Sequence, residues 1–283
     1  MAIDVHVSEA HAKLEALKNL LKSMESVVIA FSGGVDSSFL AKVAHDVLGD
    51  KVLAITARSS MYPEREFNEA VQFAAQYGIP HRVIVSEELE VEGFSDNPLN
   101  RCYLCKHELF RKIKKLAEEE DFKFVAEGSN YDDLTGDYRP GLQAVSELGV
   151  VSPLKEVKLT KDEIRFLSKE MGLPTWNKPS FACLASRFPY GEKITKEKLE
   201  MVGKAEQFLI DLGFKQIRVR YHGNVARIET NENDFDRFLE KRTREAIYSR
   251  LKELGFLYVA LDLKGYRTGS MNESFFKKGE ANA

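Results

Sequence analysis

The chain has 283 residues, of which 43% are hydrophobic and 30% charged, and its formal net charge is −3. This length predicts two domains with a sizeable core. A slightly acidic chain lacks the global field that attracts nucleic acid, which argues against nucleic acid as a partner. We find no apolar run of membrane-span length and no signal-peptide core at the polar N-terminus, so we expect a cytoplasmic protein with no membrane partner.

The first half of the chain alternates predicted helices and strands. Helical spacing covers residues 8–24, and the apolar string "SVVIAF" (26–31) predicts a buried strand. Further strands are predicted at 51–57, 81–86 and 122–128, and helices at 36–49, 63–78 and 102–120. This alternation predicts an α/β fold, a doubly wound parallel sheet with crossover helices.

The second half changes character after a loop predicted at 132–141, a helix at 161–172 and a turn-rich segment at 173–191. Beyond it the pattern predicts helices at 195–212 and 232–254, and strands at 215–221, 224–230 and 257–262. We therefore predict a first domain over residues 1–185 and a smaller α+β domain over 186–283. Three arginines, Arg218, Arg220 and Arg227, fall at alternate strand positions, which by itself fits an ordinary solvated strand face.

The string "SGGVDSS" (32–38) lies between an apolar strand and an amphipathic helix. Two glycines allow a tight turn that aims backbone N–H groups at an anion, and the helix N-terminus adds its positive dipole end. The spacing fits neither the dinucleotide fingerprint nor the Walker loop, which also needs a lysine. The plainer alternative is a glycine-rich turn without a ligand, but the whole string "AFSGGVDSS" in this context favours a phosphate loop.

This string resembles the PP-loop of the ATP pyrophosphatase superfamily, which includes GMP synthetase, NAD synthetase and tRNA thiolases. The resemblance implies a first domain that binds ATP with Mg²⁺ and releases pyrophosphate after adenylylating a substrate oxygen. The residues expected to bind ATP are those of the loop: Ser32, Gly33, Gly34, Val35, Asp36 and Ser37. Asp36 is expected to hold Mg²⁺, because this hard cation prefers carboxylate and phosphate oxygens.

Five further strings, in order along the chain, resemble the LarE family. They are "GDYRPGLQA" (136–144), "TWNK" (175–178), "SRFPYG" (186–191), "IRVRYHGNVARIE" (217–229) and "LDLKGYRTGSMNE" (261–273). The family inserts sulfur during synthesis of the nickel-pincer nucleotide cofactor of lactate racemase. The resemblance implies that ATP adenylylates a carboxylate of pyridinium-3,5-biscarboxylic acid mononucleotide. A sulfur nucleophile then displaces AMP to leave a thiocarboxylate, and the second carboxylate follows.

The same resemblance implies roles for matched residues. The residues expected to bind the phosphate and carboxylates of the substrate are Ser186, Arg187, Arg218 and Arg220. The planar guanidinium groups of the three arginines suit such anions, because each can donate two parallel hydrogen bonds. Lys106 and Arg139 are candidates for contacting the activated intermediate, and Gly128 and Asn130 follow a predicted parallel strand at its ligand-binding end. Glu206, Glu229 and Asp236 form a candidate acidic metal site, although surface carboxylates are usually just solvated. The resemblance also implies a homo-oligomer.

The chain has three cysteines, Cys102, Cys105 and Cys183. In the best-known LarE form a cysteine gives up its own sulfur, but here that position falls on Ala182. The three cysteines resemble those of cluster-dependent members, which implies a [4Fe-4S] cluster with one iron open to sulfide. Open alternatives are a sacrificial Cys183, a zinc site completed by His107, a redox pair, and three inert buried thiols.

Two other functions stay open from the sequence. A tRNA-thiolating PP-loop enzyme would predict a strongly basic surface and extra zinc-binding cysteine pairs, and the chain has neither a basic composition nor such pairs. A non-catalytic ATP-binding module would need neither three thiols nor an arginine-lined second domain. The expected partners are therefore a small nucleotide substrate and inorganic sulfide or another sulfur donor.

Overall fold

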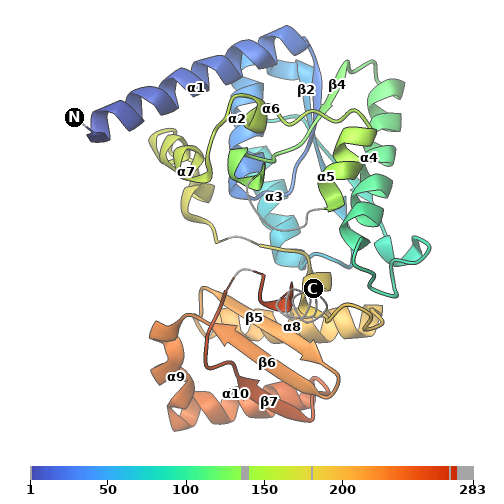
Figure 1. Cartoon of the computed structure of the whole chain (residues 1–283), viewed down its shortest axis with the longest axis vertical. Helices are drawn as coiled ribbons and strands as arrows, with labels where there is room; N and C mark the ends of the chain where they lie inside the picture. Colours follow the sequence, from blue (N-terminus) through green and yellow to red (C-terminus); the bar gives the residue numbers. More distant parts are fainter. Residues whose placement is uncertain (1, 135–139, 180, 268, 273–283) are drawn as a thin grey trace, which may run out of the picture. The chain divides into compact units, whose positions relative to one another are not determined.

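The structure, a computed structural model of the chain, describes residues 2–134, 140–179, 181–267 and 269–272. The chain divides into two compact units (Figure 1). The first contains residues 1–91 and 100–181, and the second contains 92–99 and 182–283. The second unit thus starts at residue 182 and takes in a short segment from within the first half of the chain, which sequence patterns did not indicate.

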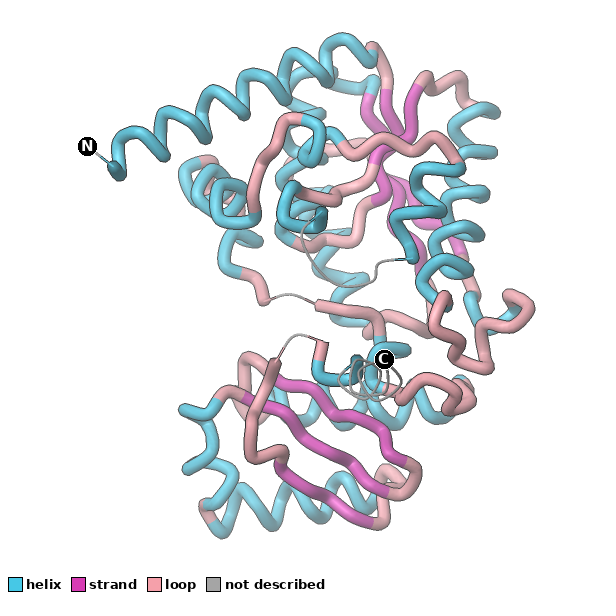
Figure 2. The backbone as a smooth tube through the Cα atoms, viewed as in Figure 1, coloured by secondary structure: helices cyan, strands magenta, loops and turns pink. Residues whose placement is uncertain are grey.

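The first unit is built on a four-stranded parallel sheet, drawn in magenta in Figure 2. Its strands are β1 (Val27–Ala30), β2 (Val52–Arg58), β3 (His81–Val85) and β4 (Phe124–Ala126), in the order β3-β2-β1-β4. In β1, Val27 pairs with Val52 on one side and with Phe124 on the other. The chain therefore adds β2 and β3 on one side of β1 and then crosses over to add β4 on the other side. Such a reversal is the place where open α/β sheets bind ligands.

Helices cover both faces of this sheet (Figure 1). One layer contains α1 (Ala2–Met24), α2 (Val35–Leu48), α3 (Glu64–Gln76), α6 (Pro153–Glu156) and α7 (Lys161–Glu170); the other contains α4 (Arg101–Glu119) and α5 (Pro140–Glu147). Successive side chains of β1 serve opposite layers, with Val27 and Ile29 in the first core and Val28 in the second. The predicted doubly wound α/β fold is confirmed.

Two local predictions in this unit were wrong. Helix α1 starts at Ala2 rather than at residue 8. The loop predicted through residue 141 ends earlier, because Pro140 begins α5; proline suits the first turn of a helix, where no intrahelical N–H bond is needed. Short 3-10 turns connect the larger elements: η1 (Gly49–Lys51), η2 (Glu88–Glu90), η3 (Tyr131–Leu134), η4 (Pro174–Asn177), η5 (Leu184–Arg187), η6 (Glu232–Asp234) and η7 (Ser270–Asn272).

The second unit is an α+β arrangement around a three-stranded sheet. Its strands are β5 (Ile217–His222), β6 (Val225–Thr230) and β7 (Tyr258–Leu261), in that order, and its helices are α8 (Lys196–Asp211), α9 (Phe235–Leu239) and α10 (Lys241–Glu253). Strands β5 and β6 are antiparallel, and β6 and β7 are parallel. Residues 92–99 join this unit by hydrogen bonds from the backbone N–H of Gly191 to Asn97 (3.0 Å) and of Ile194 to Ser95 (2.8 Å).

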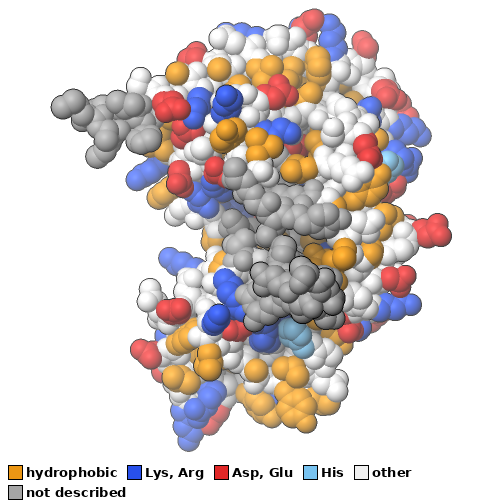
Figure 3. All heavy atoms as spheres, in the orientation of Figure 1, with side chains coloured by type: hydrophobic (Ala, Val, Ile, Leu, Met, Phe, Trp, Pro, Cys, Tyr) orange, Lys and Arg blue, Asp and Glu red, His pale blue; other side chains and the backbone are white. Residues whose placement is uncertain are grey.

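None of the helices in the described ranges combines the length and apolar character needed to cross a membrane. On the face drawn in Figure 3, acidic and basic side chains are interspersed over the first unit. This surface fits the near balance of 41 basic and 44 acidic residues in the whole chain.

Candidate functional site

The phosphate loop connects β1 to α2 and is shaped by its own hydroxyls. The side chain of Ser32 lies 3.1 Å from the hydroxyl of Ser37, and that hydroxyl also accepts from the backbone N–H of Ser32 (3.3 Å). Gly34 takes the N-cap position of α2 and has no side chain to cap it. The N–H groups of the first helical turn are therefore available to an anion, as a phosphate site requires.

Two glycines let neighbouring elements approach this loop closely. Gly33 has a φ of +69°, and a Cβ built there would lie 2.8 Å from the Cβ of Ala70 on α3. Gly128 follows β4, and its Cβ would lie 3.1 Å from the backbone nitrogen of Ser37. A larger residue at either position would displace the loop, so the two glycines fix where the loop lies between α3 and the end of β4.

Asp36, in the first turn of α2, has two side-chain partners. Its Oδ1 accepts from the amide of Asn130 (3.4 Å), and its Oδ2 accepts from the ammonium of Lys161 (2.6 Å). Asn130 comes from the loop after β4, and Lys161 is the first residue of α7. The predicted neighbours Asp36, Gly128 and Asn130 thus meet at one edge of the sheet, while Lys161 was not predicted from the sequence.

A second lysine outside the predictions, Lys178, holds the loop from the other side. Its ammonium donates to the carbonyl oxygen of Gly33 (3.2 Å) and pairs with Glu66 (2.7 Å) and Glu69 (2.6 Å) on α3. Burial alone would raise the pKa of Glu66, but the hydrogen bond from Lys178 and the contact with Arg65 bring it below the ordinary value. Lys178 ends the string "TWNK", which carries part of the family resemblance, but the sequence indicated no role for this lysine.

Lys106 on α4 pairs with Glu127, which lies directly after β4 (Nζ to Oε2, 3.4 Å). Glu127 is buried and also accepts from the hydroxyls of Ser129 (2.8 Å) and Ser152 (2.6 Å). Burial would raise the pKa of Glu127, but the charge of Lys106 and these hydrogen bonds lower it below the ordinary value. Gly141 leaves room for the lysine stem, since a Cβ there would lie 2.9 Å from its Cδ.

The predicted cysteine pair lies in the first two turns of α4. Cys102 is exposed, Cys105 is half-buried, and both are reduced thiols that could serve as ligands. The Sγ of Cys105 lies 3.9 Å from a carboxyl oxygen of Glu88, and burial raises the pKa of that carboxyl above its ordinary value. Cys183, also a reduced thiol and half-buried, belongs to the second unit, where it takes the N-cap position of η5 without a capping hydrogen bond from its side chain. Arg139, the other predicted contact of the intermediate, lies outside the described residues.

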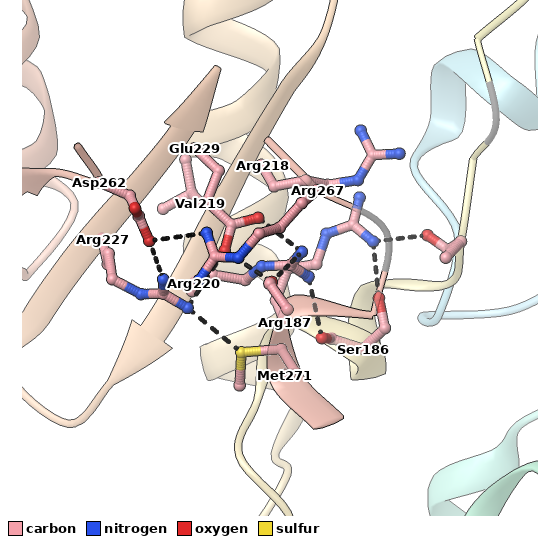
Figure 4. A network of polar contacts seen from close by, with 12 residues as sticks. Ser186, Arg187, Arg218, Val219, Arg220, Arg227, Glu229, Asp262, Arg267 and Met271 are labelled. Atoms are coloured by element: carbon pink, nitrogen blue, oxygen red, sulfur yellow. Dashed lines mark hydrogen bonds and ion pairs between the residues drawn. The ribbon is translucent and has the colours of Figure 1, made fainter. Parts of the chain in front are cut away.

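The second unit holds a network of arginines and carboxylates on β5 and β6 (Figure 4). The register places Arg218 opposite Glu229 and Arg220 opposite Arg227, so all four side chains share one face of the sheet. Arg220 pairs with Glu229 (2.7 Å) and also donates to the hydroxyl of Ser270 (3.0 Å). This face is not the ordinary solvated strand face that the arginine spacing alone would suggest, because Glu229 is fully buried.

Arg218 lies at the edge of this network and packs over the ring of Tyr266, with 5.1 Å from its guanidinium carbon to the ring centroid. Burial, followed by the neighbouring charge of Arg187, lowers the pKa of Arg218 below its ordinary value. Such a crowding of positive charge would be relieved by an anion.

Arg187, predicted as a substrate contact, is completely buried. Its guanidinium forms a two-pronged pair with Glu206 (2.8 and 2.9 Å). Its remaining nitrogen donates to the backbone oxygens of Ala182 (2.8 Å) and Cys183 (3.3 Å) and to the hydroxyl of Ser186 (2.8 Å). In this structure Arg187 therefore fixes the segment that carries Cys183 and is not itself presented to a ligand.

The candidate acidic metal site is not formed. Among the described residues, neither unit contains a group of three His, Cys, Asp or Glu side chains that could bind a metal ion. Glu206 accepts from Arg187 and from the backbone N–H of Val219 (2.8 Å), and Glu229 accepts from Arg220. Both carboxylates thus accept hydrogen bonds from groups of the same unit, and they form no metal-binding group with Asp236.

Comparison with known proteins agrees with this architecture. The profile of the NAD synthase family matches residues 10–97, which contain the phosphate loop. A parallel sheet of this order, with a loop of this sequence after its first strand, defines a PP-loop ATP pyrophosphatase domain.

Three curated relatives match almost the whole chain. Pyridinium-3,5-bisthiocarboxylic acid mononucleotide synthase of Lactiplantibacillus plantarum is 37% identical, over 94% of this chain and 95% of its own. An uncharacterized protein of Synechocystis sp. is 45% identical over 94% and 99%, and one of Methanocaldococcus jannaschii is 33% identical over 90% and 98%. The chain therefore belongs to the LarE family of PP-loop enzymes.

Proposed function

We propose that this protein is an ATP-dependent sulfur transferase that converts the carboxylates of pyridinium-3,5-biscarboxylic acid mononucleotide to thiocarboxylates for the nickel-pincer cofactor of lactate racemase. The observation that carries the proposal is near full-length similarity to a synthase of the bisthiocarboxylic product, joined to a phosphate loop with the required geometry. The reduced thiols and the need for ATP favour the cytoplasm as the compartment.

The first step proposed is adenylylation. A substrate carboxylate oxygen attacks the α-phosphorus of ATP, the bond from that phosphorus to the bridging oxygen breaks, and pyrophosphate leaves with the electron pair. Ser32, Ser37 and the N–H groups of the first turn of α2 are proposed to bind the phosphates, and Asp36 is the proposed ligand of Mg²⁺, which would neutralise phosphate charge. Lys106, held by Glu127, is the candidate contact to the acyl-adenylate.

Substrate binding is assigned to the second unit. Arg218 and Arg220, with Ser186, are proposed to bind the phosphate and carboxylates of the nucleotide. The lowered pKa of Arg218 supports this, because an arginine crowded by other positive charges gains most from an anion. Arg187 acts one step away: it orients Ser186 and the backbone around Cys183 through its buried pair with Glu206.

The sulfur source is proposed to be sulfide on a [4Fe-4S] cluster held by Cys102, Cys105 and Cys183. The reduced pair on α4, with Cys102 exposed, fits this chemistry, and alanine at position 182 removes the usual sacrificial donor. Bound there, the cluster would supply an open iron for sulfide, which is the nucleophile that displaces AMP. Sacrifice of Cys183 is the alternative, since it lies beside Ala182.

The test is anaerobic purification followed by iron and sulfide analysis and turnover with ATP, Mg²⁺, sulfide and the pyridinium substrate. We expect a coloured protein that releases pyrophosphate and forms thiocarboxylate over several turnovers. Substituting Cys102→Ala should abolish iron binding and thiocarboxylate formation while pyrophosphate release continues. An iron-free protein that thiolates its substrate once, with loss of sulfur from Cys183, would establish sacrifice instead. No ATP consumption with this substrate would refute the proposed enzymatic function.

A further inference from the structure

We propose that Lys178 is a positioning residue that holds the peptide between Gly33 and Gly34 in the orientation that binds phosphate. The inference rests on the proposed function, because it takes the loop to bind ATP, and it goes further by making one backbone peptide depend on a distant side chain. This peptide joins two glycines where the loop enters α2. Its direction determines whether the loop presents an N–H group or a carbonyl oxygen to an anion.

The peptide between Gly33 and Gly34 directs its two polar groups to opposite sides of the loop. The carbonyl oxygen of Gly33 accepts from the ammonium of Lys178 (3.2 Å). Because the peptide is trans and planar, the N–H of Gly34 points the other way, and its nitrogen lies 3.4 Å from the hydroxyl oxygen of Ser32. Ser32 is among the residues proposed to bind phosphate, so the Gly34 N–H lies on the phosphate side of the loop.

Two consecutive glycines give this peptide unusual freedom to rotate. Rotation of a peptide plane changes the ψ of the residue before it and the φ of the residue after it, and glycine tolerates either sign of φ. In the observed form Gly33 has a φ of +69° and Gly34 a φ of −79°. The opposite orientation would turn a carbonyl oxygen toward the phosphates and repel them, whereas anion sites of this kind are built from N–H groups.

Lys178 is itself held in place, so it can support the loop. Its side chain is 14% exposed, and its ammonium pairs with Glu66 (2.7 Å) and Glu69 (2.6 Å) of α3. The backbone oxygen of Lys178 accepts from the guanidinium of Arg165 (2.9 Å), which also donates to the carbonyl oxygen of Trp176 (2.7 Å). Contacts from α3 and α7 thus fix both the side chain and the backbone of this lysine.

The partners of Lys178 indicate an indirect role, without contact to phosphate. A lysine ammonium has three N–H donors, and three acceptors surround this one: the Gly33 carbonyl and the two glutamates. Arg65 also pairs with Glu66 (2.8 Å) and Glu69 (3.4 Å), so two positive and two negative charges balance in this cluster. Lys178 therefore acts by directing a backbone dipole, and it adds little net charge to the phosphate site.

The consequence is that the affinity of the loop for phosphates depends on Lys178. Without this lysine, part of the empty chains would present the carbonyl oxygen of Gly33, and phosphates would bind only the remaining chains. The apparent affinity falls in proportion to the fraction that is competent to bind. A hydrogen bond that involves a charged group typically contributes enough free energy to change such an equilibrium by about 10- to 100-fold.

The test is calorimetric titration of the full-length chain with magnesium pyrophosphate, which needs no pyridinium substrate. Lys178→Met keeps an unbranched stem but removes the donors, and we expect about 10- to 100-fold weaker binding. Lys178→Arg can still donate to the Gly33 carbonyl and should recover part of the loss. The matched control is Lys198→Met, which should bind like the wild type. Lys198 also joins a carboxylate, Glu192 (2.6 Å), to a backbone oxygen, that of Lys193 (2.8 Å), but it lies on α8 of the second unit.

Two further measurements separate peptide orientation from net charge and from general damage. Adding Glu69→Gln to Lys178→Met restores the charge balance, and we expect this double variant to bind as weakly as Lys178→Met. Labelling with ¹⁵N-glycine reports the Gly34 amide by NMR. In the free wild type it should give one sharp signal, whereas in free Lys178→Met it should be doubled or broadened by exchange until pyrophosphate is added. A merely structural loss would change glycine signals away from the loop as well.

Four results would overturn the assignment. They are binding by Lys178→Met within about threefold of the wild type, wild-type affinity in the double variant, an unchanged Gly34 signal in free Lys178→Met, and a wild-type chain that does not bind pyrophosphate. The proposed function fails in a different way. In that case pyrophosphate binding still depends on Lys178, but the wild type releases no pyrophosphate from ATP when the pyridinium substrate is present.

Discussion

The phosphate loop of the first unit and the arginine network of the second are both proposed to bind anions, but they are built by opposite means. The loop relies on backbone N–H groups, two serine hydroxyls and two glycines, with its cations supplied from other elements. The network concentrates arginines on two adjacent strands and matches most of their charge with buried carboxylates. Loop geometry thus depends on local backbone shape, while network geometry depends on long-range charge pairing.

This difference determines which kind of substitution disrupts each site. A backbone site is lost when a Cβ is added, whereas a paired charge site is lost when one partner is removed. Removal of one member of a buried ion pair leaves an uncompensated charge, which costs more than the pair itself contributes. Three substitutions test this contrast, beginning with the largest expected effect.

Substitution of Glu206→Ala should destabilise the second unit by about 3–5 kcal/mol, because Arg187 would be left buried without its carboxylate. Chemical denaturation measures the change in the free energy of unfolding. The matched control is Glu200→Ala on the same helix, whose pair with Lys204 is exposed and should contribute less than about 1 kcal/mol. Equal effects of the two substitutions would show that burial of the pair does not matter.

Substitution of Gly33→Ala should weaken ATP binding by about 100-fold, a loss of about 2.7 kcal/mol in binding free energy. The added Cβ both strains a backbone with φ of +69° and meets Ala70. Gly49→Ala is the control, since Gly49 has a φ of +58° but no atom within 4 Å of the position that its new methyl group would take. Calorimetry with ATP should leave this control unchanged; an equally weak Gly49→Ala would refute the local explanation.

Substitution of Glu127→Gln should produce the smallest effect, a pH-dependent loss of about 1–3 kcal/mol in unfolding free energy. The pKa of Glu127 is lower in the folded chain than its ordinary value of 4.5, so its stabilisation is complete above that pH and disappears as the pH falls further. Denaturation from pH 7 to well below pH 4.5 should therefore show a constant difference between wild type and variant above 4.5, and convergence of the two at more acidic pH. The exposed Glu118→Gln is the control, and a difference that stays constant well below pH 4.5 would contradict the prediction.

The sequence allowed the sheet, the loop and most helices to be predicted because each has a local signal. Apolar runs locate the buried strands, and the glycines with Asp36 mark the turn between β1 and α2. The start of α5 was missed because "RPG" is typical of a loop, although proline also suits a first helical turn. Local patterns thus predict elements well where a single interpretation dominates.

The contacts of the site could not be predicted in the same way. Lys161 and Lys178 lie 125 and 145 residues from their loop partners Asp36 and Gly33, and no spacing rule connects positions so distant. Glu206 was expected to bind metal, but it pairs with Arg187. The sequence alone does not show whether the partner of a helical carboxylate is a metal ion or an arginine. The residue types limit which interactions are possible, but the fold determines which charged side chains form ion pairs.

One face of α3 has a consequence for the energetics of ATP binding. Glu66, Glu69 and Ala70 lie at helical spacing, and all three touch either the phosphate loop or the lysine that holds it. The loop can keep its shape only while this stretch of α3 stays helical. Because a ligand that binds only the ordered form stabilises it by mass action, nucleotide in the loop also stabilises a helix that contributes no residue to the recognised motif.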